Sequence, residues 1–279
     1  MPLAECDSIR VRGAAIRARF VGSQNGTPTV AMHGYPDTLR VFEPLADAVA
    51  ATHRTLLFDW PGQGKSDPLE RTHDPWDRAD FLRDLLDAAG IDRATLIAHD
   101  MGALPALAFA QRFPERVDRV VLSHALLDDT APVSLDIELM RGCHLYPWVL
   151  SLTPGLVFDR CVASFLDPPH ALSRESLAEM RADFVAARDP VIASCRAYDA
   201  ALPTFLSSLR LPNAPFSLLW SSDDAALHFP VAHASALARR LHDPDGRAGI
   251  HLLPPCRHWA FAQGGAILAK IVEILRLGP

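Results

Sequence analysis

One aspartate at the centre of a short motif restricts the chemistry of this chain more than any other residue. Residues 98–102 read Ala-His-Asp-Met-Gly, after the apolar run 94–97 and before the helix-like run 103–108. Small residues two positions before and after Asp100 are typical of a sharp strand-to-helix turn that presents a nucleophile. A carboxylate attacks carbonyl carbon poorly but can displace a leaving group from saturated carbon, which leaves an ester for water to hydrolyse. We therefore expect Asp100 to open an epoxide or cleave a carbon–halogen bond.

A histidine and an aspartate late in the chain could complete this chemistry. His258 follows the last apolar run, residues 249–253, and a neutral imidazole is suited to removing a proton from the attacking water. Asp224 follows the preceding apolar run and could orient the histidine. Asp223 and Asp128 are the alternatives for this acid.

Two backbone N–H groups are expected to stabilise the oxyanion that forms when water attacks the ester. They belong to Met101, directly after Asp100, and to Tyr35, in the His-Gly-Tyr-Pro turn 33–36. His33 and His99 lie beside these donors in sequence, and we expect both at the substrate-binding site. For His33 a tight turn without a ligand role is the alternative.

The elements that must position these residues alternate between strands and helices. We expect a hairpin over 9–21 with a turn signal at 25–26, strands over 29–32, 55–58, 94–97, 117–123, 216–220 and 249–253, and helices over 41–51, 76–89, 103–113 and 266–277. Between about residues 128 and 212 the pattern is helical and no strand is evident. This order predicts an α/β fold, with a mostly parallel twisted sheet, helices on both faces and a helical cap. The core would span residues 1–127 and 213–279, and the cap residues 128–212.

Several motifs in this order resemble the α/β-hydrolase superfamily, specifically its aspartate-nucleophile branch of epoxide hydrolases and dehalogenases. They are the turn 33–37 (His-Gly-Tyr-Pro-Asp), the loop 59–66 (Asp-Trp-Pro-Gly-Gln-Gly-Lys-Ser), the motif around Asp100, and the late positions Asp224 and His258. The resemblance covers almost the whole chain. It implies the α/β-hydrolase fold, catalysis through an ester of Asp100, and no metal or organic cofactor.

Epoxide opening leaves an alkoxide, which a tyrosine phenol can protonate. Tyr146 and Tyr198 fall in the expected cap, where the resemblance implies two such donors. Tyr198 matches the late cap position, whereas His144 could replace Tyr146, and either ring could simply be packed. Trp148 is a candidate for the substrate-pocket wall or for a halide-binding indole.

The residues after the nucleophile separate the possible reactions. Haloalkane dehalogenases usually place a tryptophan there, and fluoroacetate dehalogenases place arginines there. This chain has Met101, Ala103 and Leu104 at these positions, which offer no such side-chain donors. Epoxide hydrolysis is therefore our first hypothesis. A haloalkane or haloacid dehalogenase is the alternative, and a lyase or small-molecule binder built on the same fold is the second alternative.

Composition limits the partners. The 279 residues are 49% hydrophobic and carry a net charge of −6 with acidic and basic residues interspersed, which argues against nucleic acid and anionic membranes. No signal-peptide pattern or membrane-spanning apolar run is evident, and the five cysteines are scattered. We expect a cytoplasmic enzyme with a small hydrophobic substrate, compatible with a homodimer.

Overall fold

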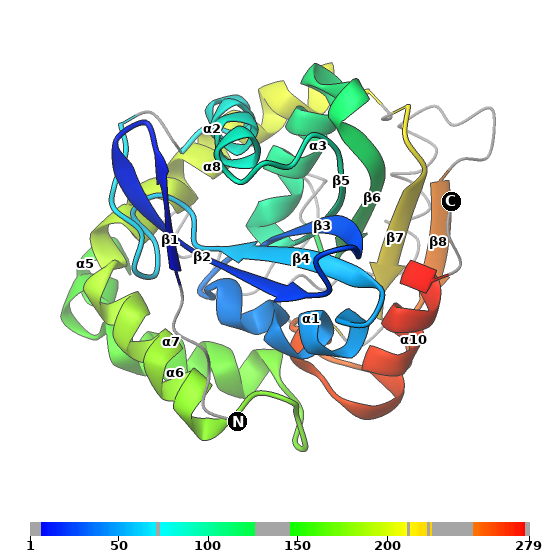
Figure 1. The fold of residues 1–279 in the computed structure, drawn as a ribbon. Helices are drawn as coiled ribbons and strands as arrows, with labels where there is room; N and C mark the ends of the chain where they lie inside the picture. Colours follow the sequence, from blue (N-terminus) through cyan, green and yellow to red (C-terminus); the bar gives the residue numbers. More distant parts are fainter. Residues whose placement is uncertain are drawn as a thin grey trace.

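The core of the molecule is an eight-stranded sheet in the part of the chain that the structure describes (Figure 1). This computed structural model describes residues 7–70, 73–125, 146–210, 213–221, 224 and 248–276. The spatial order of the strands is β1-β2-β4-β3-β5-β6-β7-β8. In chain order they are β1 Asp7–Val11, β2 Ala14–Gly22, β3 Thr27–Met32, β4 His53–Phe58, β5 Ala94–His99, β6 Val117–Ser123, β7 Phe216–Trp220 and β8 Ala248–Leu252.

Helices cover both faces of this sheet because its central strands are apolar on both sides. The pairs β1–β2 and β2–β4 are antiparallel, and the other neighbouring pairs are parallel. Figure 1 shows α2 (Pro75–Ala88) and α3 (Ala103–Arg112) on one face, and α1 (Glu43–Val49) and α10 (Gly265–Arg276) on the other. The predicted fold class is confirmed.

The N-terminal hairpin turns at a different place from the one that the sequence suggested. We expected the turn signal at Asn25–Gly26, but this dipeptide lies between β2 and β3, and the chain reverses at Arg12–Gly13. Both residues have positive φ, 51° and 87°. A two-residue hairpin loop of this conformation matches the twist of the flanking strands, so the geometry of the pair, rather than the stronger dipeptide, determines the turn.

Four helices lie between β6 and β7 in the chain, among the residues described there. They are α5 Tyr146–Leu152, α6 Pro154–Phe165, α7 Arg174–Ala186 and α8 Arg188–Ser208. This is the region where we expected a helical cap without strands. The expected boundaries of the cap, near residues 127 and 212, fall outside the described residues.

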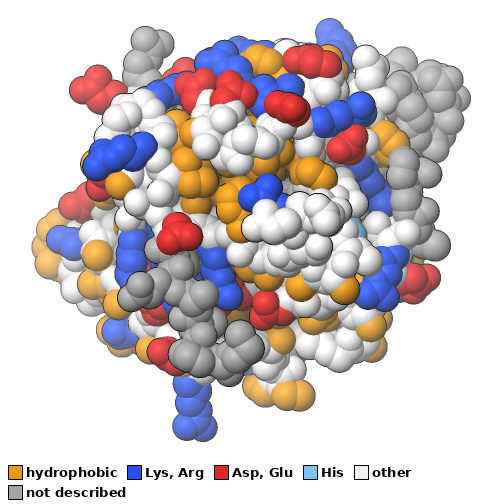
Figure 2. Space-filling model, in the orientation of Figure 1, with side chains coloured by type: hydrophobic (Ala, Val, Ile, Leu, Met, Phe, Trp, Pro, Cys, Tyr) orange, Lys and Arg blue, Asp and Glu red, His pale blue; other side chains and the backbone are white. Residues whose placement is uncertain are grey.

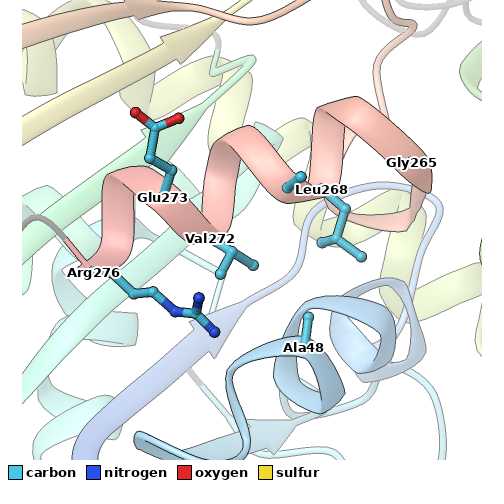
Figure 3. Close-up of a pocket in the computed structure, with 7 residues that line it drawn as sticks. Ala48, Gly265, Leu268, Val272, Glu273 and Arg276 are labelled. Atoms are coloured by element: carbon cyan, nitrogen blue, oxygen red, sulfur yellow. The ribbon is translucent and has the colours of Figure 1, made fainter.

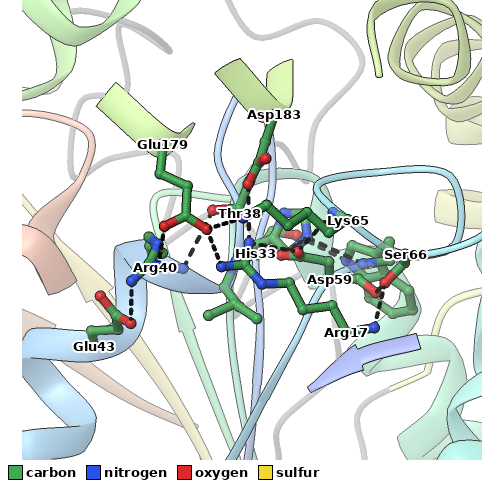
Figure 4. Close-up of polar contacts among 12 residues, drawn as sticks. Arg17, His33, Thr38, Arg40, Glu43, Asp59, Lys65, Ser66, Glu179 and Asp183 are labelled. Carbon is green, nitrogen blue, oxygen red and sulfur yellow. Dashed lines mark hydrogen bonds and ion pairs between the residues drawn. The ribbon is translucent and has the colours of Figure 1, made fainter. Parts of the chain in front are cut away.

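A cluster of ion pairs joins α7 to the core (Figure 4). The Glu179 carboxylate of α7 receives bonds from Arg17 of β2, from Arg40, and from Lys65 in the loop after β4. Arg17 also donates to Asp183, one turn further along α7, at 3.0 Å. Both arginine side chains are at most 7% exposed. This cluster therefore attaches α7 to three separate segments of the core.

The surface carries mixed charges. Figure 2 shows acidic and basic side chains scattered among hydrophobic ones over one face. A groove of about 540 Å³ lies between α1 and α10, lined by apolar side chains with Glu273 and Arg276 toward one end (Figure 3). No helix within the described ranges has the length and hydropathy to cross a membrane.

Candidate active site

Asp100 lies at the apex of a tight turn between β5 and α3. Its φ of 49° falls in the left-handed region, which is uncommon for a non-glycine residue and places its side chain beyond the strand end. A Cβ at Gly102 would come within 2.4 Å of the Met32 carbonyl oxygen, and one at Gly34 within 2.3 Å of Asp100 Oδ1. Both positions therefore require glycine, as expected for Gly102 from the motif.

The two carboxylate oxygens of Asp100 have different surroundings. The backbone N–H of Tyr35 donates to Oδ1 at 2.8 Å. Oδ2 lies 3.4 Å from Nε2 of His258. Tyr35 thus supplies an N–H at the position expected of an oxyanion-hole donor, while Oδ2 faces the imidazole. Met101 lines a cavity next to Tyr35, and the role of its N–H stays a prediction.

His258 connects Asp100 to Asp224. Its Nδ1 lies 3.0 Å from Oδ2 of Asp224, and both side chains are buried. Burial by itself lowers the pKa of His258, but the carboxylates of Asp224 and Asp100 more than offset this and raise it to about 10. The imidazole is therefore charged while both carboxylates face it. Asp223 and Asp128, the alternative acids, lie outside the described residues.

Two further histidines surround His258. The His99 ring packs 5.4 Å from that of His258, and its Nε2 lies 2.6 Å from Oδ2 of Asp37. Burial by itself raises the pKa of Asp37, but the interaction with His99 lowers it by more. The pKa therefore lies below its ordinary value, and Asp37 is ionised. The His124 ring lies 6.0 Å from that of His258. Both rings are buried and pack around the imidazole of His258.

His124 is neutral and its tautomer follows from its partners. The Ser221 N–H donates to Nε2 at 3.2 Å, so Nδ1 carries the proton and faces the Ser123 hydroxyl at 2.7 Å. Burial lowers the pKa of His124 to about 4, and Asp224 only partly opposes this. A neutral ring therefore stands after β6, where an acid was considered as an alternative.

His33 uses both ring nitrogens on the backbone. Trp60 N–H donates to its Nε2 at 3.2 Å, and Nδ1 lies 3.1 Å from the Gly34 oxygen. The ring is fully buried, and burial lowers its pKa. This geometry holds the turn that carries Tyr35. The tight-turn alternative for His33 is thus the one that the contacts favour.

A small cavity lies beside Tyr35, the residue whose N–H binds Asp100. Its lining includes Gly34, Tyr35, Pro36, Asp37, Gln63, Arg78, Met101, Val191 and Cys195. The volume of about 10 Å³ accommodates about one water molecule. Core residues form one side of the cavity and α8 of the cap forms the other. A substrate must therefore displace side chains at the boundary between core and cap.

The expected cap residues have different positions. Tyr198 is 5% exposed and lies on the face of α8 that also carries the cavity residues Val191 and Cys195, at i, i+4 and i+7.

Trp148 on α5 is 63% exposed, which does not fit a pocket wall. Tyr146 begins α5, but its side chain lies outside the described part of the structure, as does His144.

Sequence reasoning missed Asp37 and Arg78. Arg78 had a detectable signal, because it stands on the apolar face of α2 among Ala79, Leu82 and Leu85 at helical spacing. A charged residue on such a face is rarely buried unless it is paired or functional. Asp37 was only part of the turn motif, and its pairing with His99 follows from packing.

Comparison with known proteins agrees with this architecture. The sequence model of the alpha/beta hydrolase fold family matches residues 28–224. This chain belongs to the α/β-hydrolase fold family. It is a hydrolase by its similarity to characterised members of that family.

Proteins similar to this chain in sequence or in fold carry names that refer to different reactions. A 2-hydroxy-6-oxononadienedioate/2-hydroxy-6-oxononatrienedioate hydrolase of Paraburkholderia phymatum is 30% identical over 227 residues, which cover 77% of this chain and 73% of the relative. The Cif epoxide hydrolase of Acinetobacter nosocomialis has a TM-score of 0.81 at 17% identity, covering 97% of this chain and 88% of that one. The ancestral haloalkane dehalogenase AncHLD2 has a TM-score of 0.80 at 19% identity, covering 97% and 98%. These structural likenesses concern the fold.

Proposed function

We propose that this hydrolase opens an epoxide to a vicinal diol through an ester on Asp100. The observation that supports the proposal most is that the two carboxylate oxygens of Asp100 have different partners. Oδ1 accepts from the Tyr35 N–H, while Oδ2 faces His258, which is paired in turn with Asp224. One oxygen is thus available to attack while the other already occupies the position where negative charge must later be stabilised.

The first step forms the ester. Oδ2 of Asp100 attacks one epoxide carbon, the bond from that carbon to the ring oxygen breaks, and the ring oxygen takes the electron pair as an alkoxide. A proton from the Tyr198 phenol makes this oxygen a hydroxyl. Support comes from the placement of Tyr198 on the cavity-facing side of α8 and from the suitability of a phenol as an acid for this task.

The second step hydrolyses the ester. The alkylated Asp100 carries no charge, so its part in raising the pKa of His258 is lost, the pKa falls, and the imidazolium releases its proton to solvent. The neutral His258 then takes a proton from water, and the resulting hydroxide attacks Cγ of Asp100. Collapse of the tetrahedral species expels an alkoxide whose oxygen is the former Oδ2, His258 protonates it to complete the diol, and the proton left on the Asp100 carboxyl returns to His258. Tyr198 is reprotonated from solvent.

The relatives' reaction on oxo-dienedioates is a weaker candidate for this chain. Their names describe hydrolysis of an oxo-dienedioate, and hydrolysis of such an oxo acid requires attack at a carbonyl carbon. A carboxylate is a poor nucleophile there. Asp100 therefore favours saturated carbon as the point of attack.

Trapping the ester tests the proposal. His258→Gln incubated with styrene oxide should accumulate a protein species heavier by the mass of the epoxide, because formation of the ester continues while its hydrolysis stops. Asp100→Asn should show no adduct, and His251→Gln, a histidine variant on β8, should turn over without accumulating one. Intact-mass spectrometry provides the measurement. If neither styrene oxide nor glycidate gives an adduct in His258→Gln or a diol with the wild type, the proposal is wrong.

Dehalogenation is the second candidate, because displacement of halide from saturated carbon uses the same three residues and the fold matches a haloalkane dehalogenase. Tyr198 separates the two reactions. Tyr198→Phe should slow epoxide opening by roughly 10²–10⁴-fold, since the alkoxide loses its proton donor, whereas a departing halide needs no proton. Diol formation from styrene oxide and halide release from 1-bromobutane would be compared. Halide release by the wild type without diol formation would favour the dehalogenase.

A further inference from the structure

A buried guanidinium lines the cavity beside the nucleophile. Arg78 lies on α2, is 2% exposed, and shares the cavity lining with Tyr35, whose N–H binds the Asp100 carboxylate, and with Met101, the residue after Asp100. The reaction proposed above, with Asp100, His258 and Asp224, gives Arg78 no role. Its position between the core and α8 places a fixed positive charge where a substrate would enter.

The contacts around Arg78 hold the side chain in one place. Its Nη2 donates to the Ser194 hydroxyl at 3.1 Å, and its guanidinium lies 4.8 Å from the centre of the Trp60 ring. Burial lowers the pKa of Arg78 to about 10, outweighing the opposite effects of Cys195 and Tyr198. With a pKa of about 10 the guanidinium is still charged at neutral pH and can attract an anion.

The acidic groups of the cavity already face positive or N–H partners. Asp100 faces His258 and accepts from the Tyr35 N–H, and Asp37 is paired with His99 at 2.6 Å. Alkylation also removes the charge of Asp100 for the lifetime of the ester. The repulsion of an anionic ligand by these carboxylates is therefore reduced, and Arg78 provides the attraction.

We propose that Arg78 binds a carboxylate of the substrate and thereby orients the reacting carbon toward Oδ2 of Asp100. The planar guanidinium can present two parallel N–H donors to a carboxylate, which fixes direction as well as position. This inference rests on the proposed function and narrows its substrate class to epoxy acids. It differs from the hydrophobic substrate expected from the sequence, because the described cavity lining carries Arg78, Gln63 and Asp37.

An unreactive ligand pair tests the binding. Cyclopropanecarboxylate has the shape of an epoxy acid without its reactive ring, and cyclopropanecarboxamide is its neutral counterpart. Titration calorimetry should show the carboxylate binding at least tenfold more tightly to the wild type and to Arg83→Gln, a control on the exposed side of α2. Arg78→Gln should lose this preference. Arg78→Lys keeps the charge but lacks the two parallel N–H donors, so it should retain part of the preference.

Several outcomes of this titration would overturn the proposal. Equal affinity of the wild type for the two ligands would do so, as would a preference that survives in Arg78→Gln with an unchanged circular dichroism spectrum. Sodium bromide that binds as tightly as the carboxylate would make Arg78 a site for a leaving halide instead. If Arg78→Gln does not fold, Arg78→Lys carries the test through a reduced preference.

Enzyme turnover provides an independent test of the carboxylate preference. With glycidate and glycidamide as substrates, Arg78→Gln should raise KM for the acid at least tenfold and leave that for the amide nearly unchanged. Equal losses on both substrates would indicate a merely structural role and contradict the inference. A carboxylate preference in the titration without diol from either epoxide would instead overturn the proposed function while leaving the anion site intact.

Discussion

At the scale of single residues, one glycine sets the space around the Asp100 carboxylate. Gly34 lies so close to Asp100 that an added Cβ would come within 2.3 Å of Oδ1 and 2.5 Å of the Asp100 Cβ. The same turn supplies the Tyr35 N–H that holds Oδ1. Residue 34 must therefore be glycine if the Asp100 carboxylate is to lie within 3.4 Å of His258 Nε2.

Gly34→Ala should consequently displace the carboxylate and lower kcat by roughly 100-fold or more, since small misplacements at a reacting centre have effects of this size. Steady-state diol formation would measure it. Gly264→Ala is the matched control, because a Cβ there meets nothing closer than 3.9 Å, and its activity should stay at the wild-type level. A fully active Gly34→Ala would contradict the assignment of Asp100 as nucleophile.

At the scale of elements, α7 is attached to the core by charge. Glu179 receives bonds from Arg17, Arg40 and Lys65 (Figure 4). Burial tends to raise the pKa of Glu179, but these partners lower it to about 2, below the ordinary value of 4.5. Its stabilising effect is therefore present above about pH 4.5 and is lost as the pH falls through about 2.

Glu179→Gln should lower the free energy of unfolding by about 1–2 kcal/mol at pH 7, allowing for the partial exposure of the pair. The difference from the wild type should shrink as the pH falls toward 3. Urea unfolding at the two pH values provides the measurement. Asp159→Asn, which removes an exposed pair with Arg181, should change stability little. A Glu179→Gln protein as stable as the wild type at pH 7 would show that the cluster does not hold the cap.

At the scale of the whole molecule, buried histidines link stability to mild acid. Burial lowers the pKa of His33, His53 and His124, the last to about 4. Because these values lie below the unfolded value of 6.5, each neutral ring contributes stability that is complete above about pH 6.5 and is lost as the pH falls.

The midpoint of thermal unfolding should therefore drop between pH 7 and pH 5.5, above the range in which ordinary carboxylates protonate. His124→Asn has no ring to charge, so its midpoint should drop less over this interval even though it starts lower, having lost the hydrogen bond from Ser221. Thermal unfolding followed by circular dichroism at several pH values would give the change of the midpoint with pH for the wild type and for His124→Asn. An equal change in both proteins would rule out His124 as a source of the pH dependence.

Much of the fold and part of the site could be predicted because the signals are local. Buried parallel strands appear as short apolar runs, and the predicted strands lie within or close to the observed ones, for example 94–97 within Ala94–His99. The small residues around Asp100 mark a turn whose geometry depends only on its immediate neighbours. The hairpin turn was missed, since Arg12–Gly13 is a weaker dipeptide signal than Asn25–Gly26.

The sequence by itself determined the order of the elements and the turn that presents the carboxylate of Asp100, because hydrophobic period, turn stereochemistry and residue type need no distant partner. Only the tertiary structure decided which side chains meet. Asp224 reaches His258 across 34 residues, and His99 reaches Asp37 across 62. It likewise put Arg78 in the cavity and left Trp148 exposed. Contacts between residues so far apart depend on how whole elements pack, which no local pattern encodes.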